Sequence, residues 1–129
     1  ADAVSPHAPY SCHADVFRAA ARTGRPVATH LAETREEIEL LEHRSGPFVE
    51  FLQGLGVWHP EGLARGVEEV IALLDTRAPV VLAHGNFLGD LPLPADFSVA
   101  YCPRTHAAFG HPPHPAPDLL ARGVRVCLG

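Results

Sequence analysis

The sequence has no lysine and no methionine among its 129 residues, and only three cysteines. All ten cations are arginines, so this chain cannot form a Schiff-base lysine or a carboxylated lysine that bridges two metal ions. Cys12, Cys102 and Cys127 are an odd number, and no apolar leader precedes them. We therefore expect no disulfide framework and a reducing, cytoplasmic location.

Basic clusters and long apolar runs are also missing. The formal net charge is -5 and the arginines are scattered, so we expect no nucleic-acid partner, because phosphate neutralisation needs clustered cations. No apolar run approaches the roughly 18 residues of a membrane span, and we expect no membrane partner. A small-molecule partner remains, and a homo-oligomer stays open.

The length and the ends of the chain bound its organisation. A chain of 129 residues with 47% hydrophobic content can bury the core of one domain, and no internal repeat or linker divides it. Because methionine is absent, the chain does not begin at a start codon, and 124–129 resemble a strand and its exit. We therefore expect residues 1–129 to be a piece of a longer protein, truncated at both ends.

The hydrophobic pattern predicts alternating strands and helices. Strands are expected over 26–31, 79–83, 97–101 and 124–128, with a weak one over 1–5. Helices are expected over about 13–23 (capped by Ser11), 35–44, 48–55, 62–75 and 118–122, with a proline-rich loop over 103–117. This alternation predicts an α/β protein with a parallel sheet.

Three of the predicted strands lead into histidines, namely His7, His30 and His84. Right-handed crossovers bring the carboxyl ends of parallel strands to one edge of a sheet, so we expect these histidines and Cys102 to converge. In a (β/α) barrel that edge carries the active site. The sequence therefore predicts a site built around the three histidines.

Glu33 follows His30 by three residues and precedes a predicted helix. The run Thr34-Arg35-Glu36-Glu37 matches a capping box, in which the Thr34 hydroxyl accepts from the amide of Glu37 and the Glu37 carboxylate reaches back. Because Thr34 caps the helix, Glu33 is free for chemistry. An imidazole on a metal and a carboxyl on a substrate can then share one cavity.

Each candidate also has a purely structural interpretation. His30 and His84 can be strand-end histidines that hydrogen-bond to backbone groups. Glu33 can be an acidic residue favoured by the dipole at a helix start. His7 lies between two prolines and can belong to a stiff loop.

A second histidine group lies in the proline-rich segment. His106, His111 and His114 are spaced so that they can be drawn as a zinc cluster, but such a loop resists a tetrahedral wrap, and we expect them to line a pocket mouth. Cys102 and Cys127 fall on or beside predicted strands, where small buried thiols are the ordinary explanation.

Together the motifs resemble the amidohydrolase superfamily, in the cytosine deaminase-like branch of purine and pterin deaminases and triazine hydrolases. Pro6-His7-Ala8-Pro9-Tyr10 is similar to the motif that ends the fourth barrel strand of that branch, and His30-Leu31-Ala32-Glu33-Thr34 to the fifth. His84 matches the histidine that ends the sixth. The resemblance covers nearly the whole chain and implies a partial (β/α)₈ TIM barrel, approximately strands 4 to 8, with residues 1–129 as its C-terminal part.

The resemblance also implies roles. It implies one divalent metal ion, with zinc as first choice and iron as second, and His30 as its ligand. Glu33 would protonate a ring nitrogen and carry protons to the leaving group, His84 would orient and polarise a metal-bound hydroxide, and His7 would contact the substrate. The family's remaining ligands, a His-x-His pair and an Asp, would lie outside residues 1–129, so the isolated chain is expected to be inactive.

The resemblance weakens after the seventh strand. There the chain has Tyr101-Cys102-Pro103-Arg104-Thr105-His106 in place of the His-Asn-Pro-x-Ser-Asn of better-known deaminases. We predict hydrolytic deamination of an adenine-type compound, such as a 5′-modified adenosine like aminofutalosine. The alternatives are hydrolysis of another cyclic C–N or C–Cl substrate and, in a different class, a non-catalytic barrel fragment that acts as an interaction module.

Overall fold

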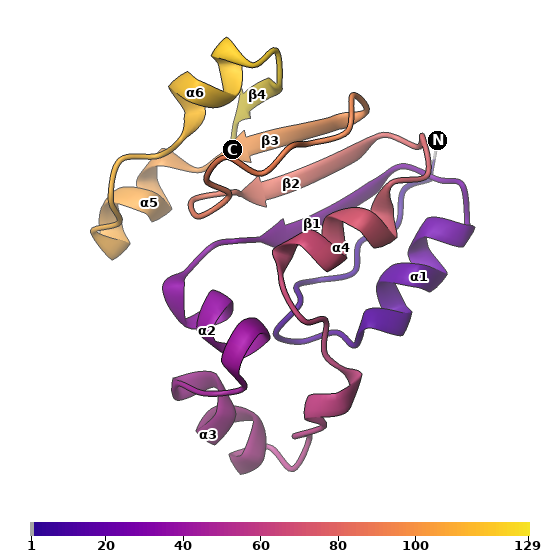
Figure 1. Ribbon diagram of the computed structural model, residues 1–129, viewed down its shortest axis with the longest axis vertical. Coiled ribbons are helices and arrows are strands. Elements are labelled where there is room, and N and C mark those ends of the chain that lie inside the picture. Colours follow the sequence, from indigo (N-terminus) through magenta and orange to yellow (C-terminus); the bar gives the residue numbers. More distant parts are fainter. Residues whose placement is uncertain (1) are drawn as a thin grey trace.

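Four parallel strands form the sheet of the computed structural model, which describes residues 2–129 (Figure 1). They are β1 (Val27–Leu31), β2 (Val80–His84), β3 (Phe97–Tyr101) and β4 (Arg125–Leu128), in the spatial order β1-β2-β3-β4. Every neighbouring pair is parallel. The predicted α/β class with a parallel sheet is therefore confirmed.

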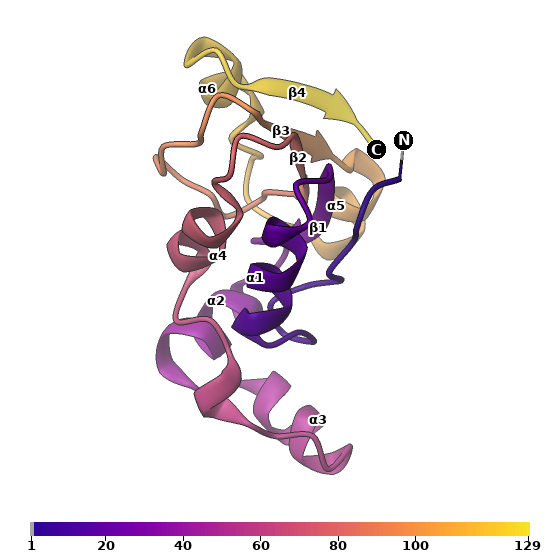
Figure 2. The ribbon, with the colours of Figure 1, turned by 90° about the vertical axis from the view of Figure 1, so that its right-hand side faces the viewer.

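The helices connect these strands. They are α1 (Ala14–Arg22), α2 (Arg35–His43), α3 (Pro47–Gly54), a 3₁₀ turn η1 (Pro60–Gly62), α4 (Val67–Leu74), α5 (Pro103–Phe109) and α6 (Ala116–Ala121). Figures 1 and 2 both show α3 at the opposite end of the molecule from β4. Of the helices in residues 2–129, none has the length and apolar character that crossing a bilayer requires.

The structure corrects four local predictions. The weak strand over 1–5 is only a single parallel bridge from Val4 to Val27. The cap of α1 is not Ser11, because His13 occupies that position and makes no side-chain cap. The helix predicted over 62–75 begins only at α4, after an extended Gly66.

The fourth correction concerns the proline-rich segment, which contains α5 instead of a continuous loop. Pro103 stands in the first turn, where the missing amide proton of proline costs no hydrogen bond. Gly110 ends the helix in the left-handed conformation, with φ 63°. The proline that indicated a loop is therefore a helix-starting residue.

The two faces of the sheet differ. One face packs against α1 and α4, which lie side by side in Figure 1, and its buried side chains include Leu31, Leu82 and Val99. The other face carries small residues and is partly exposed, with Val81 at 37% exposure. Cys127 lies in register with Ala100 and is also exposed, so the predicted burial of its thiol is wrong.

The carboxyl ends of β1, β2 and β3 lie at the same end of the sheet, as their arrowheads show in Figure 1. Two residues next to these ends adopt left-handed backbone conformations, Ala32 with φ 53° and His84 with φ 72°. The following Gly85 has φ 63°, and a Cβ atom there would lie 2.8 Å from Cδ1 of Leu88, so the turn after β2 favours glycine. These tight turns determine the direction in which the side chains of Glu33 and His84 leave the backbone.

Candidate active site

Four predicted residues meet at the carboxyl end of the sheet. Nε2 of His84 lies 3.3 Å from Oε1 of Glu33. The ring centroids of His30 and His84 are 5.4 Å apart, and those of His7 and His30 are 5.0 Å apart. The hydrogen-bond partner of Cys102 lies in β3 instead, where its Sγ is 3.6 Å from the carbonyl oxygen of Ala100.

His30 has one ring nitrogen fixed by the backbone. Its Nδ1 lies 2.9 Å from the carbonyl oxygen of His7, which also accepts from the His30 backbone amide at 2.9 Å. Only a protonated Nδ1 can donate to a carbonyl, so in the neutral ring Nε2 carries the free lone pair. A metal-ligating histidine characteristically donates its other nitrogen in this way. His30 therefore makes the predicted backbone bond and still has one nitrogen that can bind a metal.

His7 is exposed but held in place. Pro6 and Pro9 beside it are buried. Nδ1 of His7 lies 2.6 Å from the Ser11 hydroxyl, which also lies 3.2 Å from the carbonyl oxygen of Ala8. With Nδ1 held by Ser11, the Nε2 atom of His7 is the ring nitrogen that can face a ligand.

Glu33 is placed by the start of α2. The Thr34 hydroxyl accepts from the amide of Glu37 at 3.2 Å, as the capping box predicts. The Glu37 carboxylate, however, reaches past Thr34 and accepts from the amides of Ala32 and Glu33, both at 2.9 Å. Glu33 itself does not cap the helix, and its side chain is 16% exposed beside His84.

Glu37 lies beside the site, although its position in the capping box predicts only a helix cap. Its side chain is fully buried, and burial raises the pKa of its carboxyl to about 7. The position of Glu37 within the capping box was the available signal. Nothing in that spacing shows that its carboxylate serves the backbone of Glu33.

His84 is buried at the end of β2. Burial is the main reason that its pKa is lowered; the nearby His30 lowers it further, whereas the Glu33 carboxylate raises it. The imidazole is therefore neutral at pH 7 and can donate from Nε2 to Glu33. Its Nδ1 is buried without a hydrogen-bond partner among residues 2–129.

His114 supports His84 from the far end of the chain. Nε2 of His114 lies 2.7 Å from the carbonyl oxygen of His84, and the amide of Ala116 donates to its Nδ1 at 2.9 Å. These partners fix a neutral ring protonated on Nε2, which stacks on Tyr101 at 4.1 Å. The expectation that His114 lines a pocket mouth is wrong, because this side chain is buried.

The other two histidines of this segment have different partners. Nε2 of His106 lies 2.8 Å from the carbonyl oxygen of Pro112. His111 packs edge-on against Phe87, and its Nε2 is buried without a partner in the described chain. No three histidine, cysteine or acidic side chains within residues 2–129 are arranged to hold a metal ion.

An open cavity of about 470 Å³ lies beside Glu33. Its walls are mostly aromatic and apolar, from Tyr10, Pro47, Phe48, Phe51 and Phe109. The rings of Tyr10 and Phe48 stack at 4.7 Å. Burial and then the Glu33 carboxylate raise the pKa of Tyr10 to about 12, so its hydroxyl stays protonated next to the acid. The cavity thus offers a flat apolar wall with a carboxylate at its edge.

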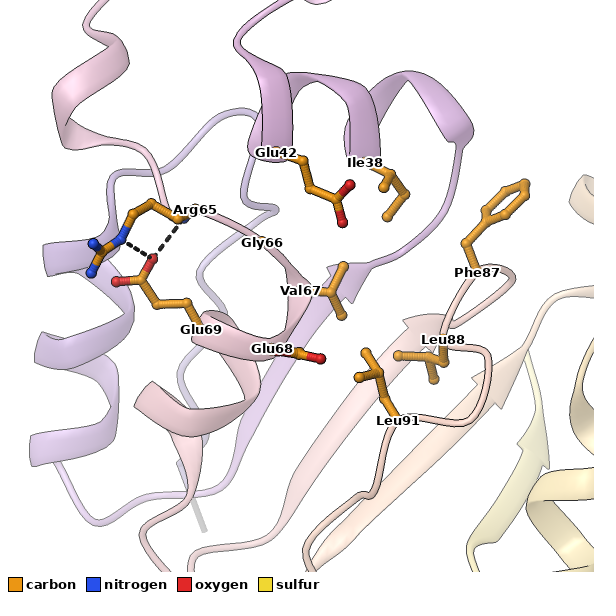
Figure 3. Close-up of a pocket in the computed structure, with 10 residues that line it drawn as sticks. All are labelled: Ile38, Glu42, Arg65, Gly66, Val67, Glu68, Glu69, Phe87, Leu88 and Leu91. Carbon is orange, nitrogen blue, oxygen red and sulfur yellow. Dashed lines mark hydrogen bonds and ion pairs between the residues drawn. The ribbon is translucent and has the colours of Figure 1, made fainter.

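A separate hollow lies between α2, α4 and the segment after β2 (Figure 3). Val67, Leu88 and Leu91 form part of its wall. At its rim Glu69 accepts from the backbone amide of Arg65 at 2.6 Å and pairs with the guanidinium of the same residue. None of the predicted site residues lines this hollow.

Comparisons with known proteins identify relatives. No family model matches the chain. It is 30% identical to the 5-methylthioadenosine/S-adenosylhomocysteine deaminase of Pyrococcus horikoshii over 98% of this chain and 28% of that protein. It is 26% identical to the 5′-deoxyadenosine deaminase of Methanopyrus kandleri over 98% of this chain and 27% of that protein.

A solved structure has a similar fold. The crystal structure of Helicobacter pylori aminofutalosine deaminase superposes with a TM-score of 0.81 and 21% identity, over 98% of this chain and 34% of that one. The chain thus spans about 28% of the length of the first of its relatives. The relatives are named as deaminases and align with 98% of the chain, which confirms the resemblance to deaminases predicted from the motifs.

Proposed function

We propose that this chain, whose relatives are deaminases of adenosine derivatives, is the C-terminal part of a (β/α)₈ barrel enzyme, approximately strands 4 to 8. The segment around Val4 would be strand 4, followed by β1 to β4 as strands 5 to 8. The partly exposed second face of the parallel sheet supports this, because such a face is covered in a closed barrel. So does the similarity in fold to aminofutalosine deaminase.

The proposed reaction is the hydrolytic deamination of an adenine-type compound. The observation that carries it is the contact of His84 Nε2 with the Glu33 carboxylate at 3.3 Å, directly beside His30. A carboxyl and a neutral imidazole in contact can hold a water molecule and pass its protons to a substrate. In this proposal Glu33 protonates a ring nitrogen and then the leaving amine, while His84 orients the attacking water and His7 contacts the substrate.

His30 would hold a divalent metal ion through Nε2, and zinc is the first choice because imidazole is one of its usual ligands. The bond from His30 Nδ1 to the His7 carbonyl supports this fit. When bound, such an ion makes hydroxide available near neutral pH. Because residues 2–129 offer no group of three ligands, the rest of the site would come from elsewhere in the protein, and the isolated chain would be inactive.

The substrate class follows from the cavity beside Glu33 and from the relatives. The aromatic walls of the cavity suit a flat heterocycle or an apolar substituent, and the adjacent Glu33 carboxylate suits a ring nitrogen. We propose a 5′-modified adenosine, for example aminofutalosine. Ammonia is then the product that identifies the reaction.

The test uses the complete protein that contains this chain, loaded with zinc. Ammonia release is measured with 5′-methylthioadenosine, S-adenosylhomocysteine, 5′-deoxyadenosine and aminofutalosine, alongside chloride release and ring opening from other heterocycles. The proposal expects ammonia from at least one adenine compound. Chloride or ring-opened product without ammonia would favour the other hydrolase chemistry, and no product with no bound metal would favour a non-catalytic interaction module.

A further inference from the structure

The backbone of Glu33 is held at both ends by buried side chains. The fully buried Glu37 carboxylate accepts from the Glu33 amide at 2.9 Å. The Asn86 side chain, 9% exposed, donates from Nδ2 to the Glu33 carbonyl oxygen at 2.9 Å. One holding residue comes from α2 and the other from the turn after β2.

These contacts do more than cap α2, because the Thr34 hydroxyl already does so. Burying a carboxylate is costly unless several donors satisfy it, and Glu37 receives the amides of both Ala32 and Glu33. Ala32 also adopts a left-handed backbone with φ 53°, which is unfavourable for a residue other than glycine. The buried carboxylate of Glu37 and the left-handed backbone of Ala32 thus both lie next to Glu33.

The turn after β2 is hydrogen-bonded to the residues that precede Glu33. The amides of Gly85 and Phe87 donate to the carbonyl oxygens of Leu31 and Ala32 at 3.0 and 3.1 Å. The strand end that presents His84 is therefore bonded directly to the segment that presents Glu33. From this turn Asn86 adds a side-chain bond to the carbonyl oxygen of Glu33.

We propose that Glu37 and Asn86 are positioning residues, which fix the backbone of Glu33 so that its carboxylate meets Nε2 of His84. This inference rests on the proposed function, in which Glu33 transfers protons. Glu37 contacts no substrate and acts only through the segment that it holds. Small displacements of a proton-transferring group reduce turnover strongly, so loss of this clamp should appear in kcat.

The first test compares Glu37→Gln with Glu42→Gln in the complete zinc-loaded enzyme. A glutamine at 37 has only one oxygen, so its NH₂ group would face a second amide donor. We expect kcat to fall about 10-fold or more with KM changed less than about 3-fold, whereas the exposed Glu42 on the same helix should be neutral. Asn86→Ala, which removes the bond to the Glu33 carbonyl, should lower kcat in the same way. All variants are assayed well below their melting temperatures, after circular dichroism shows that they are folded.

A double-variant cycle separates positioning from general destabilisation. If Glu37 acts through Glu33, adding Glu37→Gln to Glu33→Gln should reduce kcat no further. Fully additive losses, or an unchanged kcat in Glu37→Gln, would overturn the positioning role. If the wild-type enzyme releases no ammonia from any adenine compound, it is the proposed function that has failed.

Amide hydrogen exchange tests the clamp without relying on activity. In the wild-type protein the Glu33 amide is bonded to a buried carboxylate, so we expect exchange in the peptide over 31–37 to be slow. Glu37→Gln should accelerate it about 10-fold or more, and Glu42→Gln should not. Equal exchange in all three proteins would overturn the clamp whatever the reaction proves to be.

Discussion

Nε2 of His84 lies 3.3 Å from Oε1 of Glu33, and only 9% and 16% of these two side chains is exposed. Burial lowers the pKa of His84, so a neutral imidazole faces the carboxyl group. An electrostatic interaction between largely buried groups is stronger than one in water, because little solvent screens it. The pair is therefore suited to hold and transfer a proton instead of stabilising the surface of the protein.

The first prediction concerns the role of Glu33. In the complete enzyme, Glu33→Gln should leave the metal content unchanged and lower kcat by about 10²-fold or more, the usual scale for losing a general acid–base group. Metal content is measured by atomic absorption and turnover by ammonia release. Loss of the metal in this variant would instead make Glu33 a ligand and our assignment wrong.

The second prediction concerns His30. Its Nε2 carries the free lone pair, so His30→Ala should lower the zinc content of the purified enzyme and abolish turnover. Removing the metal from the wild-type protein with a chelator should abolish turnover reversibly. His84→Ala is the matched control, since it should lower turnover while the zinc content stays the same. A His30→Ala enzyme with full zinc content would contradict the assignment.

The strand ends were predictable because topology alone dictates them. Parallel strands with right-handed crossovers place their carboxyl ends at one edge, so His30 and His84 approach one another at the ends of β1 and β2. His7 joins them although only a single parallel bridge, from Val4 to Val27, precedes it. Apolar runs also located β2 and β3 to within one residue. Local sequence pattern is sufficient for these features.

The supporting side chains were not predictable in the same way. The reach of Glu37 to the amides of Ala32 and Glu33 depends on a left-handed turn that no residue type at position 32 indicates. The bond of His114 to the carbonyl of His84 joins segments far apart in the chain. Such contacts depend on how whole elements pack, and periodicity carries no information about them.

The third prediction concerns His114. His114→Phe keeps the stacking on Tyr101 but removes the donor to the His84 carbonyl and leaves the Ala116 amide without its partner. Because these groups are buried, we expect the free energy of unfolding to fall by about 1–3 kcal/mol. Urea denaturation measures this, with His43→Phe as the control because His43 is exposed. Equal stability of the two variants would mean that the bond to His84 contributes nothing.

The fourth prediction concerns the pH dependence of stability. Burial raises the pKa of Glu37 from 4.5 to about 7, opposed by the amides of Glu33 and Ala32 that donate to its carboxylate. The titratable groups that face Glu37 are the carboxylate of Glu33, which raises the pKa of Glu37 further, and the neutral hydroxyl of Tyr10. Between the pKa of 4.5 for Glu37 in the unfolded chain and the pKa of about 7 in the folded protein, the folded protein binds more protons at Glu37 than the unfolded chain does. The contribution of Glu37 to the free energy of unfolding must therefore fall as pH rises from about 4.5 to about 7 and stay constant above that.

Glu37→Gln removes this titration, so its stability should decline less than that of the wild-type protein over the same pH range. We expect the wild-type protein to lose at most about 3 kcal/mol more of its free energy of unfolding than Glu37→Gln does between these pH values. Urea denaturation at a series of pH values measures it, and Glu42→Gln should follow the wild-type curve because Glu42 is exposed. Parallel curves for wild type and Glu37→Gln would show that Glu37 titrates alike in the folded and unfolded states. In that case, ionising Glu37 in its buried position beside Glu33 would cost the folded protein no stability.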